Sequence, residues 1–208
     1  MTAAKPGPKP SRRSLLGAAG LTLAPGIVRA AATGGKPRVA IETSQGTIVV
    51  VLEDRKAPLT STNFLRYVDA GRYDGGTIYR ASRDPGAPGH GTIEGGPSEM
   101  KRRFPPIAHE STAKTGLKHK AGTLSLARNA PGTATGDFFI CASAEPFLDA
   151  RPGASGDNQG FAAFGEVVQG MEVVRKILAS PTHGKAEIEA MKGQILTTPV
   201  QIVSMKRA

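Results

Sequence analysis

The stretch 122–141 (GTLSLARNAPGTATGDFFIC) limits most strongly how this chain can fold. It contains two short apolar runs, 124–126 and 138–141, separated by a loop rich in Asn, Pro, Gly and Thr. Such a loop continues neither a helix nor a strand, so the stretch predicts a strand, a long loop and a second strand. Side chains alternate across a strand, so one of Phe138 and Phe139 should enter the core while the other lines a shallow apolar groove. Such a groove suits an extended, proline-bearing peptide.

The composition fits one domain with many turns. The chain has 208 residues, enough to bury a sizeable core, and its 26 Gly and 16 Pro favour short strands over long helices. The single cysteine, Cys141, excludes an internal disulfide and is expected to be a buried thiol. Beyond the first 30 residues no run of about twenty apolar residues occurs, so the mature chain is not expected to insert into a membrane.

The net charge of +10 overstates how basic the folded part is. Five of the 27 basic residues lie in the first 30 positions, where no acidic residue occurs. The remainder therefore carries 22 basic and 17 acidic residues, a net charge of +5. Its basic residues occur in small groups without interleaved aromatic residues, which favours a solvated surface over a nucleic-acid interface.

The N-terminal segment has the layout of an export signal. A basic start, the pair Arg12 and Arg13, an apolar run over 15–28 and small residues around Ala30 follow one another. We predict a twin-arginine-type signal over 1–30 and hence a periplasmic or otherwise exported protein. A retained membrane anchor is the alternative, which the brief, Gly- and Pro-broken apolar run disfavours.

Residues 31–37 are expected to be a linker, and residues 38–208 form the folded domain. The patterns predict a hairpin over 38–53 and strands over 77–80, 92–96 (an edge strand), 161–167 and 200–205. Loops are predicted over 81–93 and 151–159, and a turn over 144–148. Amphipathic helices are predicted over 57–70 and 170–179. Residues 97–120 give no clear pattern. Many short strands with two helices indicate a mainly β fold, a closed or nearly closed antiparallel barrel without exposed edges.

Several short segments, taken together and in order, resemble the cyclophilin family of peptidyl-prolyl cis-trans isomerases, specifically its bacterial, exported type. They are 122–128 (GTLSLAR), 138–140 (FFI), 147–149 (FLD), 164–165 (FG), 167–168 (VV), 170–171 (GM) and 173–174 (VV). The resemblance covers about 38–206. It implies a closed eight-stranded antiparallel β-barrel capped by two α-helices, an enzyme that isomerises X-Pro bonds, and no cofactor.

The resemblance also implies the residues of the site. Arg80 matches the catalytic arginine, and a guanidinium suits that task because it is always charged and holds its donors in one plane. The substrate-binding residues would be Tyr79, Glu94, Ala127, Arg128, Asp137, Phe139, Phe147, Leu148 and Phe161. An ordinary surface ion pair is the alternative for Arg80, and core packing is the alternative for the apolar residues.

Two acidic residues depart from the family pattern. Glu94 and Asp137 stand where the family has glutamine, and an ionised carboxylate accepts hydrogen bonds but cannot donate them. Glu94 could then pair with Arg80 and compete for the donors that the substrate needs. Gly91 and Thr92 also replace apolar residues of the proline pocket. We therefore expect a weakened or retuned isomerase.

The partners expected are unfolded or proline-containing polypeptides, with cyclosporin-like cyclic peptides as possible inhibitors, and the chain is expected to be a monomer. The four histidines lack metal-ligand spacing, so no metal site is predicted and the histidines are expected to be solvent-exposed. Two rival functions stay open. One is a non-catalytic peptide-binding or chaperone module on the same fold, and the other is a barrel that binds a small ligand.

Overall fold

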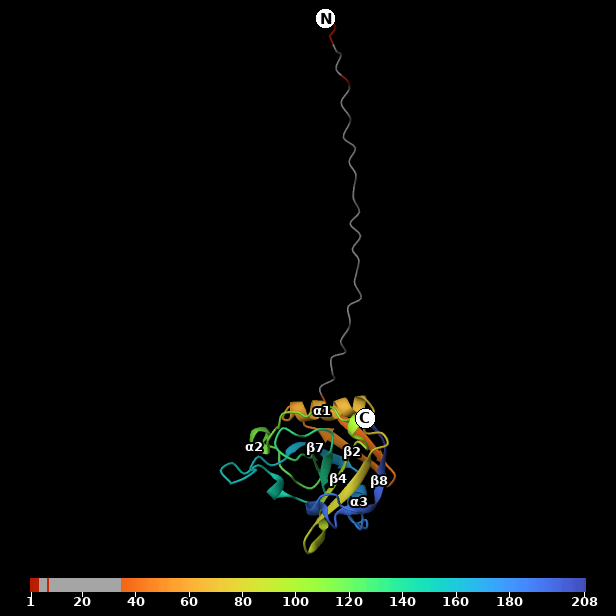
Figure 1. Cartoon of the computed structure of the whole chain (residues 1–208), viewed down its shortest axis with the longest axis vertical. Helices are drawn as coiled ribbons and strands as arrows, with labels where there is room; N and C mark the ends of the chain where they lie inside the picture. The colour runs from red at the N-terminus through yellow and green to blue at the C-terminus, as the bar shows by residue number, and fades with distance from the viewer. Residues whose placement is uncertain (4–6, 8–34) are drawn as a thin grey trace. The chain divides into compact units, whose positions relative to one another are not determined.

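The computed structural model describes residues 1–3, 7 and 35–208, and the barrel lies within 38–207 (Figure 1). The barrel is closed, and its strands are hydrogen-bonded in the order β1-β2-β7-β5-β6-β4-β3-β8. They are β1 (Arg38–Thr43), β2 (Gly46–Leu52), β3 (Thr77–Asp84), β4 (Ala87–Gly96), β5 (Thr123–Leu126), β6 (Phe138–Cys141), β7 (Ala162–Gln169) and β8 (Ile195–Arg207). The predicted fold class is confirmed. The predicted export signal lies, apart from residues 1–3 and 7, outside the described residues.

The two predicted helices pack on the barrel, and Figure 1 shows α1 across its top and α3 toward its lower end. Helix α1 (Pro58–Asp69) carries proline in its first turn, where the missing N–H costs no helical hydrogen bond. Helix α3 (Met171–Leu178) begins after Gly170, which adopts a φ of 92°. The apolar stripes that face the barrel are Phe64, Leu65 and Val68 on α1, and Val173, Val174, Ile177 and Leu178 on α3.

Aromatic rings form the centre of the core. The ring of Phe64 from α1 lies 5.3 Å from Tyr73, 5.8 Å from Phe138 and 5.2 Å from Phe164, centroid to centroid. Burying each such ring contributes roughly 1.5–3 kcal/mol. Because Phe138 is held in this cluster, the alternation of β6 turns Phe139 to the opposite face.

The predicted loop over 81–93 is wrong. Strand β3 continues to Asp84, β4 starts at Ala87, and the two strands form a hairpin that turns at Pro85 and Gly86. Gly86 takes a φ of 75°, which glycine adopts without steric cost. The hairpin forms because ladder hydrogen bonds need only the backbone, so glycine-rich segments can pair without apolar side chains. Strand β4 also pairs with β6, so the predicted edge strand over 92–96 is an interior strand.

The segment that gave no clear pattern is largely irregular. It contains a 3-10 turn, η1 (Met100–Arg102), and a single helical turn, α2 (Thr112–Thr115). Ser111 caps α2 by accepting a hydrogen bond from the backbone N–H of Ala113. The closing strand β8 is longer than the predicted 200–205. Among the described residues, no helix has the length and apolar character needed to cross a bilayer.

Candidate active site

A cavity of about 520 Å³ is lined by residues of β3, β4 and β6 and of the loops around them. All ten residues predicted for the site line this one cavity. They are Tyr79, Arg80, Glu94, Ala127, Arg128, Asp137, Phe139, Phe147, Leu148 and Phe161. The structure therefore brings these residues together around one cavity, and their roles in binding or catalysis stay predictions.

Phe139 forms the apolar wall of the cavity. It is only 5% exposed, and its ring stacks on His119 with centroids 5.8 Å apart and an interplanar angle of 14°. The ring of Phe161 meets it edge-on at 5.3 Å. Strand alternation predicts that one of the two phenylalanines enters the core and the other lines the groove, and the structure shows Phe138 in the core and Phe139 at the cavity.

Arg80 and Glu94 face each other across the β3–β4 ladder. Their Cα atoms are register partners, and Arg80 Nη1 donates to Glu94 Oε2 at 2.7 Å. The register shifts between Ile78 and Arg80, and such a bulge lets two consecutive side chains approach the same partner. Tyr79 accordingly donates its hydroxyl to Glu94 Oε1 at 2.9 Å. The predicted pairing of Glu94 with Arg80 is confirmed.

Tyr79 cannot serve as an acid near neutral pH. Burial raises the pKa of Tyr79 far above its ordinary value of 10.0, and the negative charge of Glu94 raises that pKa further. Tyr79 therefore stays protonated, so its hydroxyl remains a donor that holds Glu94 in place.

A second acceptor for Arg80 was not predicted. Gln194, which directly precedes β8, accepts hydrogen bonds through Oε1 from Arg80 Nε at 2.8 Å and Nη2 at 2.6 Å. A single glutamine more than a hundred residues away along the chain gives no local signal, so sequence reasoning could not find it.

Arg103 is the other residue that the sequence did not reveal. It follows η1 in the segment without a clear pattern, and Nη2 donates to Asp137 Oδ1 at 3.0 Å while Nη1 bonds Oδ2 and Thr135 Oγ1. The hydrogen bond to Asp137 raises the pKa of Arg103, with burial acting in the opposite direction. The carboxylate at 137 therefore enters the cavity as one half of an ion pair.

Arg128 faces the 151–160 loop with its guanidinium. Its side chain is only 2% exposed. Nη2 donates to Asp157 Oδ1 at 3.0 Å, Nε donates to Gly160 O at 3.1 Å, and the guanidinium carbon lies 5.0 Å from the ring centroid of Phe161. Arg128 thus holds the loop and the Phe161 ring against the cavity.

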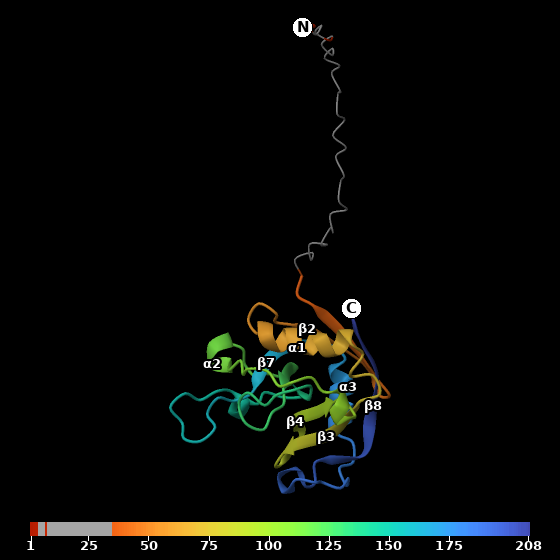
Figure 2. The same cartoon turned by 45° about the horizontal axis from the view of Figure 1, so that its top comes forward.

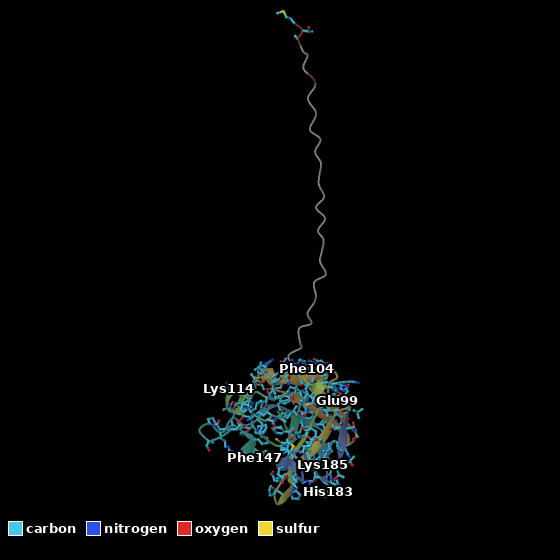
Figure 3. All side chains as sticks on the ribbon, viewed as in Figure 1. Glu99, Phe104, Lys114, Phe147, His183 and Lys185 are labelled. Atoms are coloured by element: carbon cyan, nitrogen blue, oxygen red, sulfur yellow. The ribbon has the colours of Figure 1, made fainter. Side chains whose placement is uncertain are left out.

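The lining of the cavity includes an exposed apolar turn and a glycine. Phe147, labelled in Figure 3, is 58% exposed and stands with Leu148 in the 3-10 turn η2 (Pro146–Leu148). Gly91 also lines the cavity; it has a φ of 128°, and a Cβ there would meet the carbonyl oxygen of Ser82 at 1.9 Å. No side chain fits at this position, so Thr92 is left to form this part of the wall.

His119 is a correction to the expectation that the histidines are solvent-exposed. It is 2% exposed, and its ring lies between Asp149 Oδ1, 2.8 Å from Nδ1, and Ser125 Oγ, 3.0 Å from Nε2. Burial lowers the pKa of His119, while the hydrogen bond with Asp149 acts in the opposite direction. A Ser-His-Asp set suggests a hydrolase, but Ser125 is 0% exposed, so no substrate could reach its hydroxyl. The histidine instead supports Phe139 from behind.

The cavity offers donors, acceptors and apolar walls. Within the described residues, no group of three or more His, Cys, Asp or Glu is placed to hold a metal ion. Cys141 is fully buried, and burial raises the pKa of its thiol well above the ordinary value, so a thiolate nucleophile is disfavoured. This arrangement can bind an apolar ring beside a fixed guanidinium.

Comparison with known proteins shows which family the chain belongs to. The family model for the cyclophilin type peptidyl-prolyl cis-trans isomerase matches residues 38–207. Peptidyl-prolyl cis-trans isomerase A of Dickeya dadantii is 36% identical over 173 residues, which is 81% of this chain and 83% of that protein. Peptidyl-prolyl cis-trans isomerase B of Escherichia coli is 39% identical over 140 residues, 67% of this chain and 82% of that protein.

Solved structures support the fold. A cyclophilin type isomerase of Cryptosporidium parvum, crystallised in the presence of the dipeptide Ala-Pro, superposes with a TM-score of 0.64 at 20% identity and covers 82% of this chain and 98% of that chain. The chain therefore belongs to the cyclophilin-type peptidyl-prolyl cis-trans isomerase family and is an enzyme of that class.

Proposed function

We propose that Arg80 is the catalytic residue and acts on an X-Pro bond whose proline ring packs against Phe139. The observation that carries this proposal is that the guanidinium and the ring line the same cavity. Rotation about the bond has a barrier of about 18–20 kcal/mol because the nitrogen lone pair is shared with the carbonyl. A donor directed at the prolyl nitrogen in a water-poor pocket localises that lone pair and so lowers the barrier.

The number of N–H groups that Arg80 has left for a substrate supports this role. A guanidinium carries about five N–H donors. Glu94 and Gln194 together accept three hydrogen bonds from it, one from each nitrogen. Two N–H groups thus remain for a substrate, and the engaged ones fix the plane in which the free ones lie.

We propose that the activity is retuned by the two acidic residues. Glu94 offsets part of the positive charge of the guanidinium and occupies one of its donors, and Asp137 lacks the donor that an amide would supply. Arg103 can supply a donor in its place, because it lines the cavity beside Asp137. We expect a slower isomerase whose preference among X-Pro sequences differs from that of relatives with glutamine at both positions.

The proposed substrates are proline-containing stretches of unfolded or extended polypeptides outside the cytoplasm. The Ala-Pro dipeptide used with the Cryptosporidium parvum relative supports a proline-containing ligand. The twin arginine at 12–13 and the apolar run that follows support export. Cyclosporin-like cyclic peptides are proposed inhibitors of the same groove, and the working form is proposed to be a monomer.

A non-catalytic peptide-binding module on this fold is the second candidate. It is favoured by one observation, the engagement of Arg80 by both Glu94 and Gln194. If these partners hold the guanidinium away from the prolyl nitrogen, peptides would bind without faster isomerisation.

A protease-coupled isomerase assay on the mature chain tests the proposal. Arg80→Ala should lower kcat/KM by about 100- to 1000-fold, the effect of losing one preorganised donor, while peptide binding persists. Arg175→Ala on the exposed face of α3 is the control and should behave as the wild type. Full activity of Arg80→Ala would overturn the role of Arg80, and wild-type binding without rate enhancement would select the binding module.

Export is tested separately. A fusion of residues 1–37 to a folded reporter should cross the inner membrane of a bacterial host, and replacing both Arg12 and Arg13 by Lys should block transport. Transport that continues in a host without the twin-arginine translocase would contradict the proposed route.

A further inference from the structure

We infer that Gln194 is a positioning residue for the isomerase reaction, holding the guanidinium of Arg80 in the orientation that faces the substrate. This inference rests on the role proposed for Arg80. It also brings the segment 179–194, between α3 and β8, into the active site.

The contact is suited to fixing orientation. Gln194 Oε1 accepts from Nε at 2.8 Å and from Nη2 at 2.6 Å, so one oxygen bridges two nitrogens of the same guanidinium. Glu94 contacts Arg80 only at Nη1. A single contact at one terminal nitrogen would let the plane swing about that point. The added bridge to Nε and Nη2 prevents this movement.

Gln194 is itself held at both its amide and its backbone. Its Nε2 donates to Ala190 O at 3.2 Å, its N–H donates to Met191 O at 3.0 Å, and its carbonyl accepts from Ala81 N at 2.8 Å. These contacts define which amide atom is the oxygen. In the reversed amide, the NH2 group would face the N–H donors of Arg80 and the oxygen would face the carbonyl oxygen of Ala190. The acceptor is therefore already in place before substrate binds.

The segment that carries Gln194 is tied to β3 by a second arginine. Arg83 Nε donates to Leu178 O at 2.7 Å, and Nη1 donates to Thr182 Oγ1 at 3.2 Å. Figures 1 and 2 show this blue segment beside the yellow-green β3–β4 hairpin, and Figure 3 labels its residues His183 and Lys185. Met191 of the same segment lines the cavity. The position of Gln194 is thus coupled to the strand that presents Arg80.

Three variants test the inference. Gln194→Leu removes the acceptor at similar size and should lower kcat by about tenfold, the range expected for hydrogen bonds to a charged group, with peptide affinity within about twofold of the wild type. Gln194→Glu keeps an acceptor oxygen and should lie between the wild type and Gln194→Leu. Gln201→Leu replaces an exposed glutamine on β8 and should leave both quantities unchanged.

A double-mutant comparison separates positioning from scaffold effects. In an Arg80→Ala background, Gln194→Leu should cause no further loss of kcat, because no guanidinium remains to be positioned. The NMR signal of the Arg80 Nε–H should be sharp and protected from exchange in the wild type, and broadened in Gln194→Leu.

The failures of the two proposals are distinguishable. If Arg80→Ala keeps full activity, the role proposed for Arg80 fails and the inference fails with it. If Arg80→Ala is impaired but Gln194→Leu has wild-type kcat, only the inference fails. A further loss of kcat on adding Gln194→Leu to Arg80→Ala, or an unchanged Nε–H signal, would show that Gln194 acts on the scaffold and would also overturn it.

Discussion

Arg103 reaches Asp137 across 34 residues of sequence and donates to its carboxylate from both terminal nitrogens. The side chains are 19% and 22% exposed, so the pair lies at the margin of the cavity rather than in bulk solvent. Because both residues line the cavity, the contact fixes the irregular segment around η1 beside the active site. A carboxylate in place of an amide at 137 is thereby matched by a cation from another part of the chain.

Breaking this pair should have a measurable effect on stability. Asp137→Asn should lower the free energy of unfolding by about 1 kcal/mol, the upper part of the range for partly exposed ion pairs. Urea denaturation measures the change. Asp69→Asn is the control, because Asp69 pairs with Arg207 through side chains that are about half exposed, 49% and 52%, and should cost less. Equal losses in both variants would contradict a special role for the Arg103 pair.

Restoring an amide at 94 should speed the reaction. Glu94→Gln removes the negative charge that accepts from Arg80 at 2.7 Å and leaves a neutral group able to donate as well as accept. If this is equivalent to one hydrogen bond, about 1.4 kcal/mol, kcat/KM should rise about tenfold. The protease-coupled assay measures the change, with Glu172→Gln on the exposed face of α3 as the control. No gain in Glu94→Gln would refute competition by the carboxylate.

Two glycines of the same strand should differ sharply when replaced. At Gly91 a Cβ would meet Ser82 O at 1.9 Å and the φ is 128°, whereas a Cβ at Gly89 would meet nothing within 4 Å. Gly91→Ala should therefore lower the free energy of unfolding by about 1–3 kcal/mol, the cost of a strained backbone position. Gly89→Ala should change it by less than about 0.5 kcal/mol. Thermal and urea unfolding distinguish the two variants, and similar values would contradict the close packing of Gly91 against Ser82.

The buried histidine should make stability depend on pH. Because burial lowers the pKa of His119, a proton binds the unfolded chain more readily than the folded one near the ordinary histidine value of about 6.5. The stabilisation is complete above that value and decreases as the pH falls below it. Burial also lowers the pKa of His109, which acts in the same direction.

Urea midpoints measured between pH 7.5 and 5 check this sign. The wild type should lose stability as the pH falls, and His119→Gln should show a shallower dependence even though its stability is lower at every pH. His183→Gln, at an exposed position, should keep the wild-type slope. An NMR titration that shows the His119 ring charged at pH 6.5 would contradict the argument.

Local patterns were enough to predict much of the fold. Alternation predicted that one of Phe138 and Phe139 enters the core and the other lines the groove, as observed, and helical spacing predicted that α1 and α3 each bury one apolar face. The sequence predicts a loop in place of the β3–β4 hairpin because Gly and Pro normally signal a break in structure. Its pairing depends on backbone hydrogen bonds that apolar periodicity does not report.

By itself, the sequence determined the strand and helix periods and the barrel class, because these depend on neighbours within a few positions. The resemblance to the family supplied the residues expected around Arg80. Only the tertiary structure decided the partners of the charged groups. Three hydrogen-bonded pairs join segments far apart in sequence: Arg80 with Gln194, Arg103 with Asp137, and His119 with Asp149. Hydrogen bonds depend on distances of about 3 Å, which barrel closure sets and linear spacing does not reveal.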